Sequence, residues 1–137
     1  MKKILVDTNI ILDLLARRLP FYKEAAELFT LADNKKIALA ISSLSLVNTH
    51  YVLTKYKPGQ EAREILRRFR VLVKVLSFDD RIADLALNSG FKDFEDAIQY
   101  YTAIENEQEL IVSGNLSGFH KSKIPVLTAR EFVKSMN

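Results

Sequence analysis

Short apolar runs, separated by segments with helical spacing, constrain the fold of this chain more than any other feature of its sequence. The runs are 4–6, 37–41, 73–76, 110–112 and the weaker 126–127. Continuously apolar strands are typical of parallel sheets, because helices cover both faces of such a sheet. Strands that alternate with helices therefore predict an α/β fold, a three-layer α/β/α sandwich with a central, mostly parallel sheet.

The segments between the runs carry signals for the ends of helices. Pro20 suits the first turn of a helix that continues to about Asp33. Residues 60–72 have the pattern of a basic amphipathic helix. Asp79 and Asp93 are predicted to cap the next two helices, since aspartate is favoured at that position.

Composition limits the class of protein. With 137 residues, of which 48% are hydrophobic, residues 1–137 are expected to form one domain. No apolar run approaches the roughly 20 residues that span a bilayer, and the first residues lack a secretory pattern. The absence of cysteine excludes disulfides and thiolate metal sites. We therefore expect a cytoplasmic protein with no membrane partner.

Charge is distributed unevenly along the chain. The net charge is only +3, but residues 55–74 hold seven basic side chains against two acidic ones, whereas residues 79–109 hold nine acidic against two basic. The basic helix could steer RNA towards the protein through phosphate contacts. Its candidate side chains are Arg63, Arg67, Arg68 and Arg70. The plainer interpretation is a solvated helix face.

The first apolar run ends in a carboxylate, Asp7, which Thr8 and Asn9 follow directly. In open α/β sheets, ligands bind beyond the carboxyl ends of the strands, so Asp7 stands where chemistry is expected. A bare acid at a strand-to-helix junction is a natural ligand for a hard cation such as Mg²⁺. The alternative is that Asp7 only caps the helix that follows.

Other polar side chains follow the neighbouring runs and are expected at the same edge of the sheet. They include Asn48 after the second run, and Ser113 and Asn115 after the fourth. A carboxylate from residues 93–96 could join them, although acids at a helix start also complement its dipole. Oxygen ligands of this kind suit Mg²⁺ or Mn²⁺, and a cation held there can polarise a phosphate and activate water.

Several of these motifs, in this order, resemble the PIN domain family over nearly the whole chain. They are Val6-Asp7-Thr8-Asn9, Arg18-Leu19-Pro20-Phe21, Ser42-Ser43-Leu44-Ser45-Leu46-Val47-Asn48, Lys92-Asp93-Phe94-Glu95-Asp96-Ala97-Ile98-Gln99-Tyr100 and Ile111-Val112-Ser113-Gly114-Asn115. The resemblance implies a single α/β/α domain with Mg²⁺- or Mn²⁺-dependent ribonuclease activity on RNA. It also implies the toxin half of a VapBC-type toxin–antitoxin pair, with a small antitoxin as partner and a tendency to form homodimers.

The resemblance also implies roles for individual residues. Asp7 and Asp96 would be the first and third metal-holding acids, and Asp93 would help to complete the shell. Asn48 and Asn115 stand where the family usually has its second and fourth acids, and they would complete the catalytic group with Asp7 and Asp96.

Some relatives carry the fourth acid three residues after an asparagine like Asn115, but here that position is Gly118. The site therefore has less negative charge than is usual, and we expect weak or one-metal binding. Thr8, Asn9 and Ser113 are predicted to position ligands or a substrate phosphate.

Two alternatives stay open. The same fold, with amides at two acid positions, could be a catalytically weak or inactive module that binds RNA or a protein partner. A phosphatase of the haloacid dehalogenase type would also begin with a strand and an aspartate, but it needs a second aspartate where this chain has Asn9.

Overall fold

Five parallel strands form one sheet in the computed structural model, which describes all 137 residues. The strands are β1 (Lys2–Val6), β2 (Ile37–Ser42), β3 (Val73–Leu76), β4 (Leu110–Val112) and β5 (Val126–Leu127). The α-helices are α1 (Thr8–Leu15), α2 (Tyr22–Asp33), α3 (Ser43–Leu53), α4 (Gly59–Phe69), α5 (Asp80–Leu87), α6 (Phe94–Glu105) and α7 (Ala129–Ser135), and a 3₁₀ helix, η1, spans Leu116–Phe119. The predicted α/β/α class is confirmed, and the sheet is parallel throughout.

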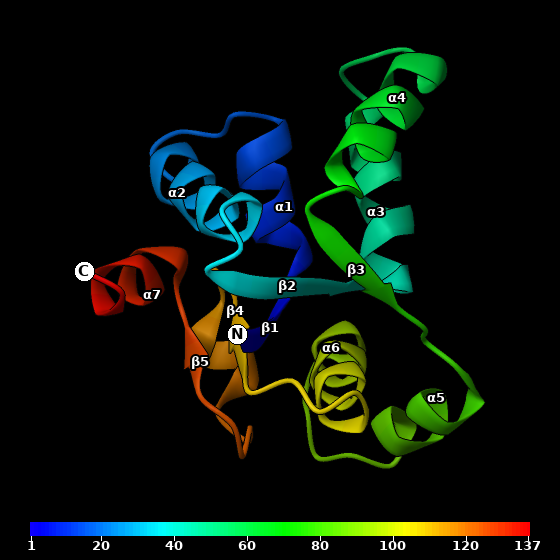
Figure 1. The fold of residues 1–137 in the computed structure, drawn as a ribbon. Coiled ribbons are helices and arrows are strands. Elements are labelled where there is room, and N and C mark those ends of the chain that lie inside the picture. Colours follow the sequence, from blue (N-terminus) through cyan, green and yellow to red (C-terminus); the bar gives the residue numbers. More distant parts are fainter.

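The two faces of the sheet are covered by different helices (Figure 1). Alternate residues of a strand point to opposite faces, so Ile4 and Val6 pack in the larger core with α1, α2, α3, α4 and α7. Leu5 lies in a smaller core on the other face, with α6 and η1. Helix α5 packs against the outer side of α6. Burial on both faces explains why the strand sequences are apolar without interruption.

Side-chain caps fix the points at which the chain turns from strand or loop into helix. Ser42 Oγ accepts a hydrogen bond from the Ser45 amide, and Asp79 Oδ1 accepts one from the Ile82 amide. Thr128 and Glu131 form a complete capping box at the start of α7. Each cap satisfies a backbone donor that has no partner within its helix.

The strand order β3-β2-β1-β4-β5 places the polar strand ends together. The chain builds β2 and β3 on one side of β1, and then β4 and β5 on the other. Val6 pairs with Val112, and the Asp7 amide donates to the Val112 carbonyl oxygen at 2.9 Å. Asp7 and Ser113 therefore emerge side by side where the direction of strand addition reverses, which is the usual ligand site of such sheets.

The structure differs from the sequence prediction at two helix boundaries and in one additional helix. Helix α2 begins at Tyr22, so Pro20 precedes the helix. Helix α4 ends at Phe69 and not at 72, because the chain must turn before Val73 can pair with Leu39. The 3₁₀ helix η1 was not predicted. No helix has both the length and the apolar character needed to cross a membrane.

Candidate metal centre

Asp7 is buried and held by three hydrogen bonds. Its Oδ1 accepts from the Thr8 amide at 2.8 Å and from Gln99 Nε2 at 3.0 Å, and its Oδ2 accepts from Ser113 Oγ at 2.8 Å. An ionised carboxylate has about four lone-pair positions, so one position on Oδ2 stays available to a cation. Asp7 is also the N-cap of α1, which means that the capping and ligand interpretations are compatible.

Burial dominates the electrostatics of Asp7. Removal from water raises the pKa of its carboxyl group, and the charge of Asp93 raises it further. The hydrogen bonds from Ser113, Thr8 and Gln99 oppose this by stabilising the charged form, and so lower the pKa. Three donors aimed at one buried carboxylate are the arrangement expected when its charge is needed.

Gln99 is the functional side chain that the sequence analysis missed. It is fully buried, and its Nε2 donates to Ser45 Oγ at 2.6 Å as well as to Asp7. Its Oε1 has no hydrogen-bond partner. If the Gln99 amide were flipped, Oε1 would face the Asp7 carboxylate, which can only accept hydrogen bonds. Nε2 must therefore face Asp7, and this orientation leaves Oε1 without a partner. Such a cost, about 1 to 3 kcal/mol, is typical of groups kept for function.

Asp96 lies in a cluster of carboxyl groups at the start of α6. Desolvation raises the pKa of Asp96 to about 7, and the charges of Asp7, Asp93 and Glu95 contribute to the increase. The pKa of Glu95 is also raised, first by burial and then by Asp7 and Asp93. The structure therefore brings Asp7 and Asp96 together as predicted, in a cluster whose negative charges repel one another.

Asn48 and Asp93 each have a partner within this cluster. Asn48 Nδ2 donates to Glu95 Oε1 at 3.3 Å, which lowers the pKa of Glu95. Asp93 Oδ2 accepts from the Asp96 amide at 3.2 Å, so Asp93 is the N-cap of α6. The cap uses one of its carboxylate oxygens and leaves the other available to a cation.

Gly118 and Asn115 close the cluster from the η1 side. A Cβ added to Gly118 would overlap Asp96 Oδ2 and would lie 3.1 Å from Asn115 Nδ2. Asn115 is exposed, and its Oδ1 accepts from Ser117 Oγ at 2.9 Å. The space that a fourth acid would occupy at position 118 is therefore taken by the Asp96 carboxylate.

Thr8, Asn9 and Ser113 make internal contacts in this structure. Thr8 Oγ1 lies 2.7 Å from Ser45 Oγ, and Asn9 Oδ1 accepts from the Gly114 amide at 3.1 Å. Ser113 Oγ donates to Asp7. These bonds show how the three side chains fix Asp7 and the β4–η1 loop, while their predicted role towards a substrate stays a prediction.

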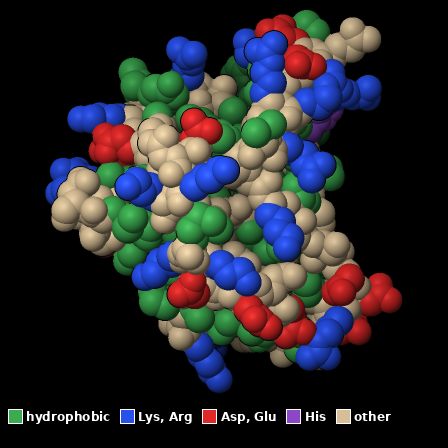
Figure 2. Space-filling view, viewed as in Figure 1, with side chains coloured by type: hydrophobic (Ala, Val, Ile, Leu, Met, Phe, Trp, Pro, Cys, Tyr) green, Lys and Arg blue, Asp and Glu red, His purple; other side chains and the backbone are tan.

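Three of the predicted arginines, Arg63, Arg67 and Arg68, lie on α4, and Arg70 directly follows it; none of the four reaches the carboxylate cluster. Helix α4 runs into the amino end of β3, so Arg67, Arg68 and Arg70 lie towards the edge of the sheet opposite to Asp7. Arg67 and Arg68 form ion pairs with Glu64. In Figure 2, Lys and Arg side chains are spread over the face shown, several of them at the upper right, where Figure 1 shows α4, and acids gather at the lower right, near α5 and α6. Any effect of these arginines on RNA would be a long-range electrostatic one.

The donors fit a hard divalent cation in their chemistry. They are the oxygens of Asp7, Asp96, Asp93 and Glu95, with the amide oxygen of Asn48 beside them, and no sulfur or histidine takes part. Mutual repulsion among the carboxylates, visible in the raised pKa values, is what a cation would relieve. No three acidic or histidine side chains form a ready coordination shell, so binding of a cation would require side-chain movements.

Comparisons with known proteins agree with this architecture. The family model of the PIN domain matches residues 3–117. Ribonuclease VapC1 of Aquifex aeolicus (strain VF5) is 28% identical over 141 residues, covering 99% of this chain and 96% of that protein. A chain in a toxin–antitoxin complex from Klebsiella pneumoniae is 26% identical, with a TM-score of 0.67 over 92% of this chain and 97% of its own.

A chain of the DNA-bound VapBC from Salmonella typhimurium shares the fold, with a TM-score of 0.70, 21% identity, and coverage of 94% of this chain and 99% of its own. The haloacid dehalogenase alternative has no support among these findings. Because the family model covers most of the sequence, the chain belongs to the PIN domain family.

Proposed function

We propose that this chain is a divalent-metal-dependent endoribonuclease that hydrolyses RNA, and that it is the toxin component of a toxin–antitoxin pair in the cytoplasm. The observation that carries the proposal is the pairing of a buried, triply hydrogen-bonded Asp7 with Asp96 at the carboxyl edge of a PIN-domain sheet. The similarity to a ribonuclease along the full chain supports the same activity.

The residues have separate tasks in this proposal. Asp7 and Asp96, with Asp93 or Glu95, would hold Mg²⁺ or Mn²⁺. A bound cation would polarise the scissile phosphate and make a water molecule more acidic. Gln99 and Ser113 keep Asp7 in one orientation and favour its charged form. Asn48 adds a neutral oxygen, which weakens cation binding relative to an acid at this position.

Partners are inferred from the relatives. The Klebsiella structure is a toxin–antitoxin complex, so we propose a small antitoxin as partner of this chain and a homodimer as its own assembly. Helix α3 offers apolar surface for such contacts, because Val47 and Tyr51 are 66% and 65% exposed. Light scattering of the protein alone would report the assembly state.

A second candidate function is a PIN-domain module that binds RNA without cutting it. The specific observation in its favour is the loss of acids at positions 48, 115 and 118, which leaves amides or no side chain. Binding of RNA without cleavage at millimolar Mn²⁺ would support this module over the nuclease.

The decisive experiment follows cleavage of labelled single-stranded RNA with Mg²⁺, Mn²⁺ or EDTA. We expect cleavage that requires the cation and is lost in Asp7→Asn, whereas Asp84→Asn, which changes an exposed acid on α5, behaves as wild type. A parallel melting experiment should show that Mn²⁺ stabilises wild type and not Asp7→Asn. Cleavage that persists in EDTA and in Asp7→Asn would refute the proposal.

A further inference from the structure

A cleft lies beside the carboxylate cluster, on the other side of Asn9. Its volume is about 270 Å³, and it is lined by α1, the start of α2, the β4–η1 loop and the start of α7. A neighbouring hollow of about 280 Å³ shares Asp13, Phe21 and Gly114 with it and adds Arg18. The two hollows form one cleft, which we call the Asp13 cleft. Each is slightly below the usual range for drug-sized ligands, so each has room for about one ring.

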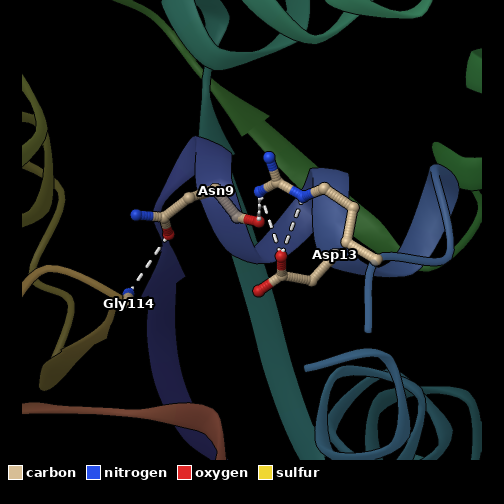
Figure 3. A network of polar contacts seen from close by, with 4 residues as sticks. Asn9, Asp13 and Gly114 are labelled. Carbon is tan, nitrogen blue, oxygen red and sulfur yellow. Dashed lines mark hydrogen bonds and ion pairs between the residues drawn. The ribbon is translucent and has the colours of Figure 1, made fainter. Parts of the chain in front are cut away.

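Asp13 presents a free carboxylate oxygen to the cleft. The residue is 5% exposed. Only its Oδ1 is bonded, to Arg18 Nε and Nη2, both at 3.0 Å, and no partner binds Oδ2 (Figure 3). Burial raises the pKa of Asp13, while the charge and hydrogen bonds of Arg18 lower it. Asp13 lines the cleft, so its unpaired Oδ2 can accept a hydrogen bond from a ligand bound there.

Phe21 also lines the cleft and is unusually open to solvent. The residue is 59% exposed, and Leu19, two residues earlier, is 84% exposed. Packing in the core does not account for an aromatic ring in this position. Exposed aromatic rings are the usual surfaces on which proteins stack the bases of single-stranded RNA.

The cleft is physically joined to the carboxylate cluster. Gly114 lines the cleft and donates its amide to Asn9 Oδ1 at 3.1 Å, and Figure 3 shows Asn9 between Gly114 and Asp13. The residue before Gly114 is Ser113, whose hydroxyl bonds Asp7. Arg18 Nη2 also donates to the Asn9 carbonyl oxygen at 2.9 Å. A strand of RNA with its phosphate at Asp7 would thus have a neighbouring base within reach of the cleft.

Charge in the cleft suits a base better than a phosphate. Asp13 and Glu24 are balanced by Arg18 and Arg130, so the lining carries no excess positive charge. A carboxylate oxygen accepts from the exocyclic amino groups of cytosine, adenine and guanine. Uracil has no such amino group: its exocyclic groups are carbonyl oxygens, and its only base donor on that edge is the N3–H between them.

We propose that the Asp13 cleft binds one base of the RNA next to the scissile phosphate, with Phe21 stacking on it and Asp13 Oδ2 selecting bases that carry an amino group. This inference rests on the proposed ribonuclease function and adds to it a site that sets base preference. The partner chemistry is a single-stranded, amino-bearing nucleobase.

The test measures affinity and cleavage separately. Affinities for short homopolymers of A, C, G and U are measured by fluorescence anisotropy in the Asp7→Asn background, so that RNA stays intact. Phe21→Leu keeps an apolar side chain but removes the aromatic face, and Phe21→Tyr keeps the ring. Leu87→Ala, which removes an exposed apolar side chain from α5, is the control. Cleavage sites on mixed-sequence RNA are mapped for the same changes with Asp7 intact.

We expect Phe21→Leu to weaken binding of the A, C and G homopolymers by about 5- to 150-fold, the range of one base–aromatic stack. Phe21→Tyr and Leu87→Ala should stay within about twofold of the parent. In Asp13→Asn, the ratio of the affinity for the A, C and G homopolymers to the affinity for the U homopolymer should fall by about tenfold or more, because the asparagine amide can also donate to uracil carbonyls.

Two results would overturn the proposal. One is unchanged affinity and unchanged cleavage sites in Phe21→Leu, and the other is binding of the U homopolymer as tight as that of the A, C and G homopolymers.

A failure of the cleft proposal can be distinguished from a failure of the ribonuclease proposal. Binding that depends on Phe21 without cleavage by wild type refutes the nuclease and keeps the cleft. Cleavage with no effect of Phe21 or Asp13 refutes the cleft and keeps the nuclease. Melting curves identify any variant that fails to fold; if Phe21→Leu does so, the effect of Asp13→Asn on the preference for amino-bearing bases over uracil decides.

Discussion

Replacing Gln99 with methionine separates the structural from the functional role of this buried amide. Gln99→Met keeps an unbranched side chain of similar length, which suits a helix interior and adapts to its surroundings. The change removes the donor to Asp7 Oδ1 and to Ser45 Oγ. It also removes Oε1, which is buried without a partner.

These two effects act in opposite directions on stability. The hydrogen bond to the charged Asp7 contributes about 1.5 to 3 kcal/mol and the one to Ser45 about 0.5 to 1.5 kcal/mol, whereas an unsatisfied buried oxygen costs about 1 to 3 kcal/mol. We therefore expect the free energy of unfolding of Gln99→Met to lie no more than about 2 kcal/mol below that of wild type. Cation binding has no such compensation, because the hydrogen bond from Gln99 is one of the contacts that hold the pKa of Asp7 down. Its loss should weaken Mn²⁺ binding by about 10- to 100-fold.

Gln108→Met is a matched control. Gln108 is also a buried glutamine whose Oε1 has no partner, and its Nε2 donates to the Asn106 carbonyl oxygen at 2.9 Å. It precedes β4, at the edge of the sheet away from Asp7. Urea unfolding and calorimetric titration with Mn²⁺ measure the two quantities. A Gln99→Met protein that is several kcal/mol less stable but binds Mn²⁺ like wild type would show that Gln99 is only structural.

Three further changes test the electrostatics of the carboxylate cluster. The pKa of Asp96 is raised to about 7 in the folded protein, so the folded state binds more protons than the unfolded state between about pH 4 and pH 7. The stability of the metal-free protein should therefore fall as pH rises through this window. Mn²⁺ should stabilise the protein more at pH 8 than at pH 5, because Asp96 is then ionised. The rise in pKa from 3.8 corresponds to at most about 4 kcal/mol, which screening on the open side reduces to about 1 to 2 kcal/mol in urea unfolding; a flat profile would contradict it. Gly118→Ala should lower the free energy of unfolding by about 1 to 2 kcal/mol, because the added Cβ overlaps Asp96 Oδ2. This loss should disappear in an Asp96→Ala background. Gly59→Ala is the control and should leave stability unchanged, because nothing lies near its Cβ. Asn48→Asp replaces the donor to Glu95 Oε1 with a like charge. It should therefore lower the stability of the metal-free protein in urea unfolding and tighten Mn²⁺ binding by about tenfold in calorimetry. A variant with lower stability and weaker Mn²⁺ binding would contradict the assigned position of Asn48.

The fold was predictable because its signals are local. Apolar runs without interruption indicate a parallel sheet covered on both faces, and the capping residues Asp79 and Asp93 lie where helices were expected to begin. The boundaries that were missed depend on tertiary contacts. The end of α4 at Phe69 is set by the pairing of Val73 with Leu39, which no local pattern contains.

The candidate site was predictable only in part, for a similar reason. An acid directly after a buried strand indicates a site, so the sequence itself predicted Asp7. Asp96, in the first turn of α6, was assigned only by the resemblance to the PIN domain. Gln99 was missed because its burial depends on β1 and α3 as well as its own helix. A signal was available, since residues 96, 99, 100 and 103 share one face of a helix, and a glutamine between Asp96 and Ala103 on that face is an anomaly.

The amides at the acid positions have a consequence for the metal-free protein. With the charges of Asp7, Asp93 and Glu95 already close enough to raise the pKa of Asp96, further acids would add repulsion that only a cation could offset. Asn48 instead donates a hydrogen bond to Glu95, which an ionised carboxylate at that position could not do. Gly118 leaves room for Asp96 itself. The replacements at these positions are therefore expected to lower the affinity for a cation and to make the metal-free protein more stable. Occupancy of such a site should need a higher metal concentration than occupancy of a site with four acids.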